Sequence, residues 1–410
     1  MTERGSCRFC GAGLSHVCAD LGIAPIANDL IEADQLDRME PYYPLRALVC
    51  ERCLLVQVGE FESPGAIFSD YSYFSSFSTS WLAHCRAYVE SVSGRFSIGA
   101  EHTVVEIASN DGYLLQYFRE RGIPVLGIEP AENVAQAAIV KGIPTVVRFF
   151  GTEAARDLAQ TSRADLLIGN NVLPHVPDLN DFVAGMSILL AERGLITIEF
   201  PHLARLIADR QFDTIYHEHF SYFSLTTAKG VFARHGLTIF DVEEIPTHGG
   251  SLRIYARHSA DSTKPEQASV TRLLTREAEA GLNALETFTA FAEQPPALKR
   301  ELLRLLIDLK ESGSTVVGYG APAKGITLLN YCGIGTDFLD YTVDKSPHKQ
   351  GRYLPGVRIP IRAPDEIRRT RPDYVLILPW NLKDEIVEEM AFVREWGGRF
   401  LVRAPHMTTI

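Results

Sequence analysis

The chain lacks the marks of a membrane-spanning, secreted or nucleic-acid-binding protein. None of its apolar runs approaches the length of a membrane span, and Met1–Ser6 contains no apolar signal-peptide segment. Positive charge is scarce, because 40 Lys and Arg face 51 Asp and Glu and leave a net charge of −11, which argues against a broad nucleic-acid surface. We therefore expect a cytoplasmic chain, monomeric or weakly dimeric, with no membrane or nucleic-acid partner.

Two nucleotide-binding fingerprints are missing as well. The G-x-G-x-x-G run of dinucleotide-binding proteins is absent from the turn after the predicted strand 103–108, where only Gly112 is present. The later glycine-rich turn 314–325 lacks the spacing and the Lys-Ser/Thr pair of a P-loop. These absences exclude a P-loop and disfavour NAD as the ligand of the first turn.

What the chain does contain is a repeated alternation of apolar strands and helices. Its 410 residues, 46% of them hydrophobic, suffice for two or three domains. The central part indicates a doubly wound parallel sheet closed by an antiparallel hairpin. Its predicted elements are strands at 103–108, 125–130, 145–147, 165–171 and 195–200, helices at 113–121 and 181–190, and a hairpin at 237–243 and 251–257.

The last part of the chain repeats this alternation on a smaller scale and predicts a second doubly wound domain. Its predicted elements are a linking pair of helices within 266–311, the glycine-rich turn 314–325, strands at 340–345 and 373–380, and a helix at 365–369. The alternative is a nucleotide-binding fold that has been retained only for its sheet.

Two stretches are candidates for binding the phosphates of a substrate. In the turn 314–325, Lys324 stands where it could meet a phosphate at the start of the next helix. The stretch 70–81 is rich in Tyr and Ser, which can line a pocket with hydroxyl donors or form the packed entry to the helix that follows. We expect Lys324, with Tyr73 and Ser75, to bind a diphosphate.

Four of the seven cysteines form two C-x-x-C pairs, Cys7 with Cys10 and Cys50 with Cys53. In a cytoplasmic chain a zinc site is favoured over disulfides, with chance pairing as the other alternative. Four thiolates leave no open coordination position, so the zinc would be structural. The remaining cysteines are expected in the core: Cys18, Cys85 and Cys332.

Acidic and amide side chains mark the carboxyl ends of the first strands of the central sheet. Glu106 is followed by Asn110, Asp111 and Gly112 in the first turn, and Glu129 ends the second strand. Carboxylates here would repel a pyrophosphate but suit the ammonium and sulfonium groups of S-adenosylmethionine, with Glu129 placed to accept hydrogen bonds from the ribose. The pattern favours S-adenosylmethionine over NAD, although the acids could be ordinary surface residues.

The segment 214–224 gathers aromatic, imidazole and carboxylate side chains in one place. If it is extended, His217 and His219 share one face and could bind a metal or exchange protons. The alternative is a solvated loop without a catalytic or binding role. Spacing alone does not decide which imidazole would be a base. Nearby aromatic rings would hold such a histidine neutral by desolvation.

These motifs together resemble a known family, the S-adenosylmethionine-dependent sugar C-methyltransferases that act at C-3 of nucleotide-linked 4-keto-6-deoxysugars. The motifs are the paired C-x-x-C module, E-I-A-S-N-D-G, N-N-V-L-P-H-V, Y-H-E-H-F-S-Y, H-G-G-S-L-R, V-G-Y-G-A-P-A-K-G and V-D-K-S-P-H-K-Q-G, which span nearly the whole chain. The resemblance implies an α/β protein with three parts. They are an N-terminal zinc-binding module (1–85), a class I methyltransferase domain with a Rossmann-like fold (86–262), and a helical linker with a second, C-terminal Rossmann-like domain (263–410).

The resemblance also implies roles for particular side chains. His219 matches the general base that removes the proton next to the ketone, and Tyr216 the residue that assists at the ketone. Glu218 and His175 match supporting groups of the active site. The cofactor set is completed by Asn170 and Asn171, and Ala108 departs from the glycine that many methyltransferases carry in the first turn.

The implied reaction needs no redox metal or nicotinamide. A histidine with a pKa near the working pH can abstract a proton next to a ketone if donors stabilise the enolate, which then takes the sulfonium methyl group. The dTDP or GDP identity of the nucleotide is left open by the sequence. The rival functions are methylation of a sugar oxygen or nitrogen, and a non-catalytic scaffold that only binds partners.

Overall fold

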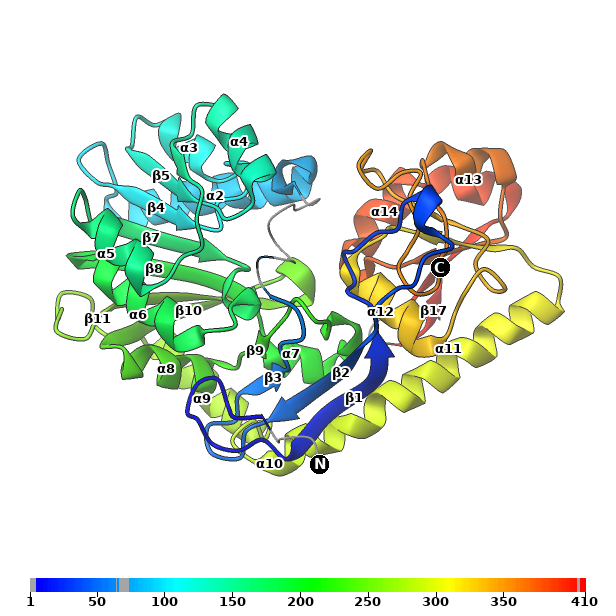
Figure 1. Cartoon of the computed structure of the whole chain (residues 1–410), viewed down its shortest axis with the longest axis horizontal. Coiled ribbons are helices and arrows are strands. Elements are labelled where there is room, and N and C mark those ends of the chain that lie inside the picture. Colours follow the sequence, from blue (N-terminus) through cyan, green and yellow to red (C-terminus); the bar gives the residue numbers. More distant parts are fainter. Residues whose placement is uncertain (1–4, 64, 66–73, 404–405) are drawn as a thin grey trace.

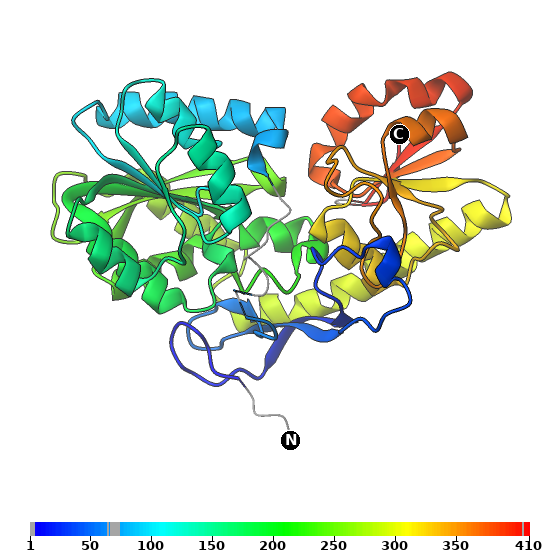
Figure 2. The same cartoon turned by 45° about the horizontal axis from the view of Figure 1, so that its top comes forward.

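The computed structural model describes residues 5–63, 65, 74–403 and 406–410, and within these residues the strands form three sheets. Two α/β domains stand side by side, and a smaller N-terminal sheet lies beneath both of them (Figures 1 and 2). Among the described residues, no helix combines the length and apolar character needed to cross a bilayer.

The N-terminal sheet is antiparallel, and its fourth strand comes from the middle of the chain. Its order is β1-β2-β3-β9, with β1 (His16–Ala24), β2 (Tyr43–Val49), β3 (Val56–Val58) and β9 (Ser221–Tyr222). Because Val56 of β3 pairs with Tyr222 of β9, the segment predicted to carry the chemistry adds a strand to the sheet of the zinc-binding module.

The central sheet has the order β10-β11-β8-β7-β4-β5-β6, parallel except for the hairpin β10–β11, as the sequence predicted. Alternate residues of its strands feed two apolar clusters, one under α5, α6 and α8 and the other under α2, α3 and α4. The strands are β4 (Val104–Ile107), β5 (Val125–Ile128), β6 (Thr145–Val146), β7 (Ala164–Asn170), β8 (Leu190–Pro201), β10 (Leu237–Ile245) and β11 (Ser251–His258). The helices are α2 (Thr79–Phe96), α3 (Leu115–Arg119), α4 (Glu132–Val140), α5 (Thr152–Ala159), α6 (Leu179–Leu189), α7 (Leu203–Ala208) and α8 (Leu225–Arg234).

The linker holds three helices rather than the predicted pair. They are α9 (Ala268–Glu279), α10 (Leu285–Ala290) and α11 (Gln294–Glu311). Gly281, with a φ of 78°, lies in the break after α9. The prolines at 295 and 296 fit only the first turn of α11, since a proline has no amide hydrogen to donate. Figure 1 shows α11 running from beneath the N-terminal sheet to the C-terminal domain.

The C-terminal domain is the predicted second doubly wound fold, with the strand order β14-β13-β12-β15-β16-β17. Its core cluster on one face is continuous with the N-terminal sheet and α11, so the three parts share buried apolar surface. The strands are β12 (Val316–Tyr319), β13 (Thr342–Val343), β14 (Ile361–Arg362), β15 (Tyr374–Ile377), β16 (Arg399–Val402) and β17 (Thr408–Thr409). The helices are α12 (Ala323–Cys332), α13 (Asp365–Thr370) and α14 (Lys383–Glu389).

Candidate active site and zinc centre

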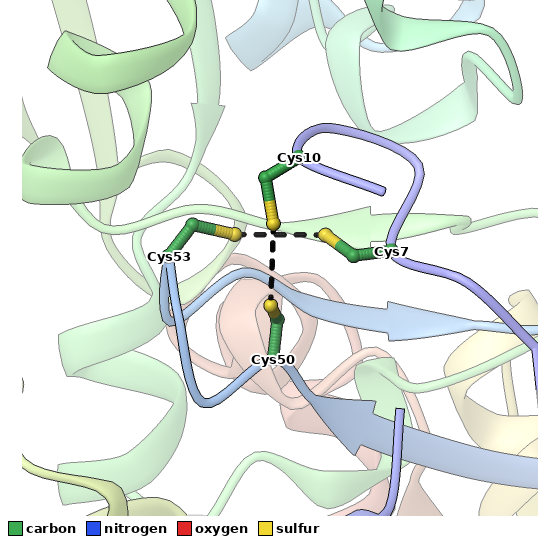
Figure 3. Close-up of side chains that lie close together, drawn as sticks. All are labelled: Cys7, Cys10, Cys50 and Cys53. Carbon is green, nitrogen blue, oxygen red and sulfur yellow. Dashed lines mark hydrogen bonds between the residues drawn. The ribbon is translucent and has the colours of Figure 1, made fainter. Parts of the chain in front are cut away.

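The four paired cysteines converge on one centre, as their spacing predicted (Figure 3). The Sγ atoms of Cys7 and Cys53 are 3.5 Å apart, as are those of Cys10 and Cys50, and all four lie within 4.8 Å of one another. Four thiolates about 2.3 Å from a tetrahedral zinc would be about 3.8 Å from each other, so the residues fit a structural zinc.

The two knuckles that carry these cysteines have the same backbone geometry. The residue after each second cysteine has a left-handed φ, 74° at Gly11 and 59° at Leu54. Its amide donates back to the first cysteine of the pair, over 2.9 Å to the Cys7 carbonyl and 2.8 Å to the Cys50 carbonyl. This tight turn brings both sulfur atoms of a C-x-x-C pair to one side.

The zinc knuckle is also tied to the methyltransferase domain. Arg8, between the first two cysteines, donates to the carbonyls of Pro177 (2.9 Å) and Val58 (2.6 Å). Asn180 donates its side-chain amide to the Arg8 carbonyl over 3.0 Å. The zinc-binding module is therefore hydrogen-bonded to residues 177–180, which follow β7.

The turn after β4, which the sequence predicts to bind the cofactor and which we call the cofactor turn, lies at the carboxyl edge of the central sheet. Ala108, Asn110 and Gly112 have φ values of 55°, 49° and 74°. Glycine is usual at such positions because the left-handed region crowds a Cβ atom, and this explains why Ala108 stands out from the wider class. Ala108 does adopt the required backbone, so the turn keeps its shape.

The acids lie where the sequence placed them, around this turn. Glu106 is fully buried, and burial raises its pKa well above the ordinary value. Glu129 follows β5, and its two carboxylate oxygens accept the amides of Asn110 and Ala131, each over 2.9 Å. Burial raises the pKa of Glu129 while those amides oppose the rise. Asp111 pairs with Lys141 at 2.8 Å.

Asn170 is a candidate ligand-binding residue because its side-chain amide is buried and unpaired among the described residues. It ends β7 beside the cofactor turn and is 7% exposed. Neither its amide nitrogen nor its oxygen has a hydrogen-bond partner among the described residues. A buried amide without partners is costly, so a polar ligand at this sheet edge would satisfy it. Its neighbour Asn171 instead donates to Nε2 of His248 over 3.1 Å.

Tyr216, His219 and His175 form a compact group, in which His219 is buried and the other two residues are half-buried. Nδ1 of His219 lies 3.1 Å from the Thr214 carbonyl, which can only accept, so this nitrogen carries the proton. Nε2 is then the basic nitrogen, and the Tyr216 hydroxyl donates to it over 2.8 Å. The His175 ring packs edge-on against the His219 ring, with the ring centres 4.6 Å apart, and its Nδ1 donates to the Glu218 carbonyl over 2.6 Å. Burial lowers the pKa of His219 well below its usual value and that of His175 to about 4.

His217 does not share a face with His219, which corrects the expectation for an extended segment. Residues 216–219 form a turn in which the His219 amide donates to the Tyr216 carbonyl over 3.0 Å. His217 therefore points toward the N-terminal module, with Nε2 3.3 Å from the Pro44 carbonyl. Glu218, between them, accepts the Asn28 amide at 3.0 Å, and burial raises its pKa to about 7.

The C-terminal domain contributes Lys324 to the same region. Its amine donates to Asn381 over 2.7 Å and lies 4.6 Å from the centre of the Trp380 ring. Burial lowers the pKa of Lys324 to about 8, and its charge depresses the pKa values of His219 and His248. These two contacts of Lys324 stay within the C-terminal domain, and its positive field extends to the two histidines.

The other two diphosphate candidates are not joined to Lys324 by any described contact. The Ser75 amide donates to the Asn110 side chain over 2.9 Å, which puts this residue beside the cofactor turn. Tyr73 lies outside the described residues.

Sequence reasoning missed a group of side chains above the carboxyl end of β8. Glu199 accepts from Arg253 Nε at 2.7 Å and from His84 at 3.0 Å, and these partners outweigh burial and lower its pKa. The Trp81 ring stacks on the His84 ring, with centres 4.9 Å apart, and its centre lies 5.4 Å from that of the His248 ring. The H-G-G-S-L-R motif contains His248 and Arg253 and was the signal that could have pointed to this group.

Three family models match successive parts of the chain. They are described as "Putative zinc binding domain" (7–68), "Methyltransferase domain" (81–242) and "C-methyltransferase C-terminal domain" (246–405). Together with the cofactor edge and the cysteine cluster, they define an S-adenosylmethionine-dependent methyltransferase with a zinc-binding module.

A whole-chain relative narrows this class. The C-methyltransferase NovU of Streptomyces niveus is 36% identical over 405 residues, covering 98% of this chain and 96% of its own. The chain therefore belongs to the sugar C-methyltransferase family that its motifs resemble, and it is an enzyme that methylates carbon.

Solved methyltransferase structures align with less than half of the chain. Magnesium protoporphyrin IX methyltransferase (ChlM) of Synechocystis PCC 6803 with bound SAM covers 43% of this chain and 79% of its own, with 14% identity and a TM-score of 0.34. The CcbJ methyltransferase of Streptomyces caelestis covers 43% of this chain and 90% of its own, with 13% identity and a TM-score of 0.35.

Proposed function

We propose that this enzyme methylates C-3 of a nucleotide-linked 4-keto-6-deoxysugar, dTDP- or GDP-linked, and that His219 is the general base. The observation that carries the proposal is the hydrogen bond between the half-buried Tyr216 and the buried His219. The proton on Nδ1 is committed to the Thr214 carbonyl, and Nε2 is left as the acceptor. A fixed basic nitrogen next to a hydroxyl donor suits proton abstraction beside a ketone.

The surroundings of His219 explain how it would be neutral before substrate binds and basic afterwards. Burial is the first cause of its lowered pKa, and the fields of His175 and Lys324 add to it. A substrate diphosphate at Lys324 would offset that positive field and raise the basicity of Nε2. The anionic substrate would thus activate its own base.

Tyr216 would serve the ketone side of the substrate. Its hydroxyl lies 2.8 Å from Nε2, so a carbon held against that nitrogen has its neighbouring ketone within reach of the same hydroxyl. Donation to the ketone oxygen would stabilise the negative charge that develops on enolisation. Glu218 and His175 would hold the segment in place, since His175 donates to the Glu218 carbonyl at 2.6 Å.

The methyl donor would be held by the carboxyl edge of the central sheet. The residues proposed to bind it are Glu106, Asn110, Asp111, Gly112, Glu129, Asn170 and Asn171. S-adenosylmethionine supplies an electrophilic methyl group there. Its positive charges would lower the raised pKa values of Glu106 and Glu129 and favour their ionised forms, and the Asn170 amide, which has no partner among the described residues, would give it a donor and an acceptor.

The sugar nucleotide would lie at the junction of the two α/β domains, with its diphosphate at Lys324 and also at Tyr73 and Ser75. Supporting this position, the charge of Lys324 in the C-terminal domain acts on His219 and His248, and its pKa of about 8 leaves it mostly protonated at neutral pH. The zinc, held by four cysteines, has no free position for substrate and would act only on the fold.

The proposal is tested by incubating the enzyme and S-adenosylmethionine with a panel of dTDP- and GDP-linked 4-keto-6-deoxysugars. We expect one sugar to gain a methyl group on carbon 3, located by NMR, with loss of a deuterium label placed at that carbon. Transfer to a sugar oxygen or nitrogen, or to a carbon remote from the ketone, would contradict the proposal.

A further inference from the structure

The domain junction contains a buried carboxylate whose two oxygens are both held by the opposite domain. Asp213 lies in the 3-10 helix η4 (Phe212–Thr214) of the methyltransferase domain and is fully buried. Trp380 donates its indole N–H to Oδ2 over 2.8 Å, and Arg403 donates to Oδ1 over 2.6 Å. Both donors belong to the C-terminal domain.

Arg403 holds the same segment at a second point. This arginine, 1% exposed at the end of β16, also donates from both terminal nitrogens to the Arg210 carbonyl, over 2.9 and 2.7 Å. Its guanidinium lies 5.0 Å from the centre of the Phe212 ring. The C-terminal domain thus holds the Arg210 backbone on one side of Phe212 and the Asp213 side chain on the other.

The clamped segment leads directly to the proposed base. The residue after Asp213 is Thr214, whose carbonyl accepts the Nδ1 proton of His219 at 3.1 Å. The Thr214 hydroxyl donates to the Gln211 carbonyl over 2.7 Å, and the Ile215 amide donates to Phe212 over 3.0 Å. Because these hydrogen bonds join residues 211–215 in one turn, a change at Asp213 would move the carbonyl that orients the imidazole.

We propose that Asp213 is a positioning residue for the methyl-transfer reaction. Held by Arg403 and Trp380, it fixes the Thr214 carbonyl, which keeps His219 in the Nδ1–H tautomer with Nε2 directed at the substrate. The catalytic consequence rests on the proposed function of His219, whereas the effect on the tautomer does not. Docking of the C-terminal domain would therefore complete the active site as well as bind substrate.

The test is Asp213→Asn, which keeps the size of the side chain but turns an amide NH₂ toward one of the two donors. We expect kcat to fall about 10- to 100-fold, with KM values for both substrates within about threefold of wild type, since orientation of a base acts on the chemical step. Trp380→Phe removes one donor and keeps the ring packing, so it should lower kcat by a smaller factor and serves if the first variant folds poorly.

The matched control is Glu277→Gln. This carboxylate is buried to the same degree and accepts from His202 at 2.7 Å and from the Leu225 amide at 2.6 Å, away from Thr214. It should lower the melting temperature without lowering kcat. A kcat for Asp213→Asn within about threefold of this control would overturn the positioning role.

A second readout does not depend on turnover. The chain is labelled with ¹⁵N-histidine, and an NMR spectrum of its 12 histidines is recorded. The signals of His219 are identified as those that disappear in His219→Gln. Wild type should show a protonated Nδ1, and Asp213→Asn a mixture of tautomers. An unchanged tautomer would overturn the proposal. If His219→Gln retained proton abstraction, the base assignment would fail by itself, and the tautomer would still decide the role of Asp213.

Discussion

Gly249, in the H-G-G-S-L-R motif, is predicted to be indispensable because it lies against Trp380. Its φ is 89°, in the region that favours glycine. A Cβ atom added there would lie 2.5 Å from Cζ3 of Trp380 and 3.0 Å from Nε2 of Gln211. Gly249→Ala must therefore displace the indole that contacts both Lys324 and Asp213.

The expected cost has two parts. A left-handed backbone costs an alanine about 1–2 kcal/mol relative to glycine. Displacing Trp380 would break its hydrogen bond to the charged Asp213, and such bonds contribute about 1.5–3 kcal/mol. We therefore expect Gly249→Ala to lower the free energy of unfolding by about 2.5–5 kcal/mol.

Gly236→Ala carries only the first part, the backbone cost, so the difference between the two variants gives the second part. Gly236 has a φ of 72°, and a Cβ atom there would meet no heavy atom of the described chain within 4 Å. Urea unfolding followed by tryptophan fluorescence would give both free energies, with Gly236→Ala losing only about 1–2 kcal/mol. If the two variants were equally stable, the close approach to Trp380 would not matter and the described junction would be wrong.

Three further predictions concern the metal, the cofactor and pH. The purified chain should hold one zinc, and Cys50→Ser should lower the yield of folded protein several-fold while the surviving protein keeps its turnover; a folded, metal-free preparation would contradict this. Glu129→Ala should weaken S-adenosylmethionine binding in calorimetry by about 2–4 kcal/mol, with sugar affinity unchanged. A loss of sugar affinity instead would show that the cofactor site has been assigned to the wrong domain. The pKa of His175 is lowered from 6.5 to about 4, so the unfolded chain binds its proton first as the pH falls. Stability present above pH 6.5 should therefore be lost toward pH 4, by about 2 kcal/mol at pH 5. His175→Gln should remove that share of the pH dependence, and an unchanged slope would refute it.

The parts of the structure that follow from local spacing were predictable from the sequence. The spacing of Cys7 and Cys10 limits their sulfur atoms to one side of a turn, and short continuous apolar runs define the buried strands. The carboxyl edge of a parallel sheet collects Glu129 and Asn170 whatever the loops do. These features need no knowledge of distant contacts.

The parts that depend on docking were not predictable. The direction of His217 is set by a turn and by the Pro44 carbonyl of the N-terminal module, so its spacing from His219 was misleading. The pairing of Asp213 with Arg403 joins residues 190 positions apart, and neither residue carries a motif. The second of these contacts exists only because two independently patterned domains meet.

Proton abstraction without methyl transfer tests the role of His219 most directly. The enzyme is incubated in deuterated water with its keto sugar and S-adenosylhomocysteine, and deuterium uptake at the ring carbon is followed. His219→Gln should slow this exchange about a hundred- to ten-thousand-fold. His217→Gln, which removes the other imidazole of the same turn, should leave it near the wild-type rate. Exchange that persists without His219 and disappears without His217 would contradict the assignment of His219 as the base.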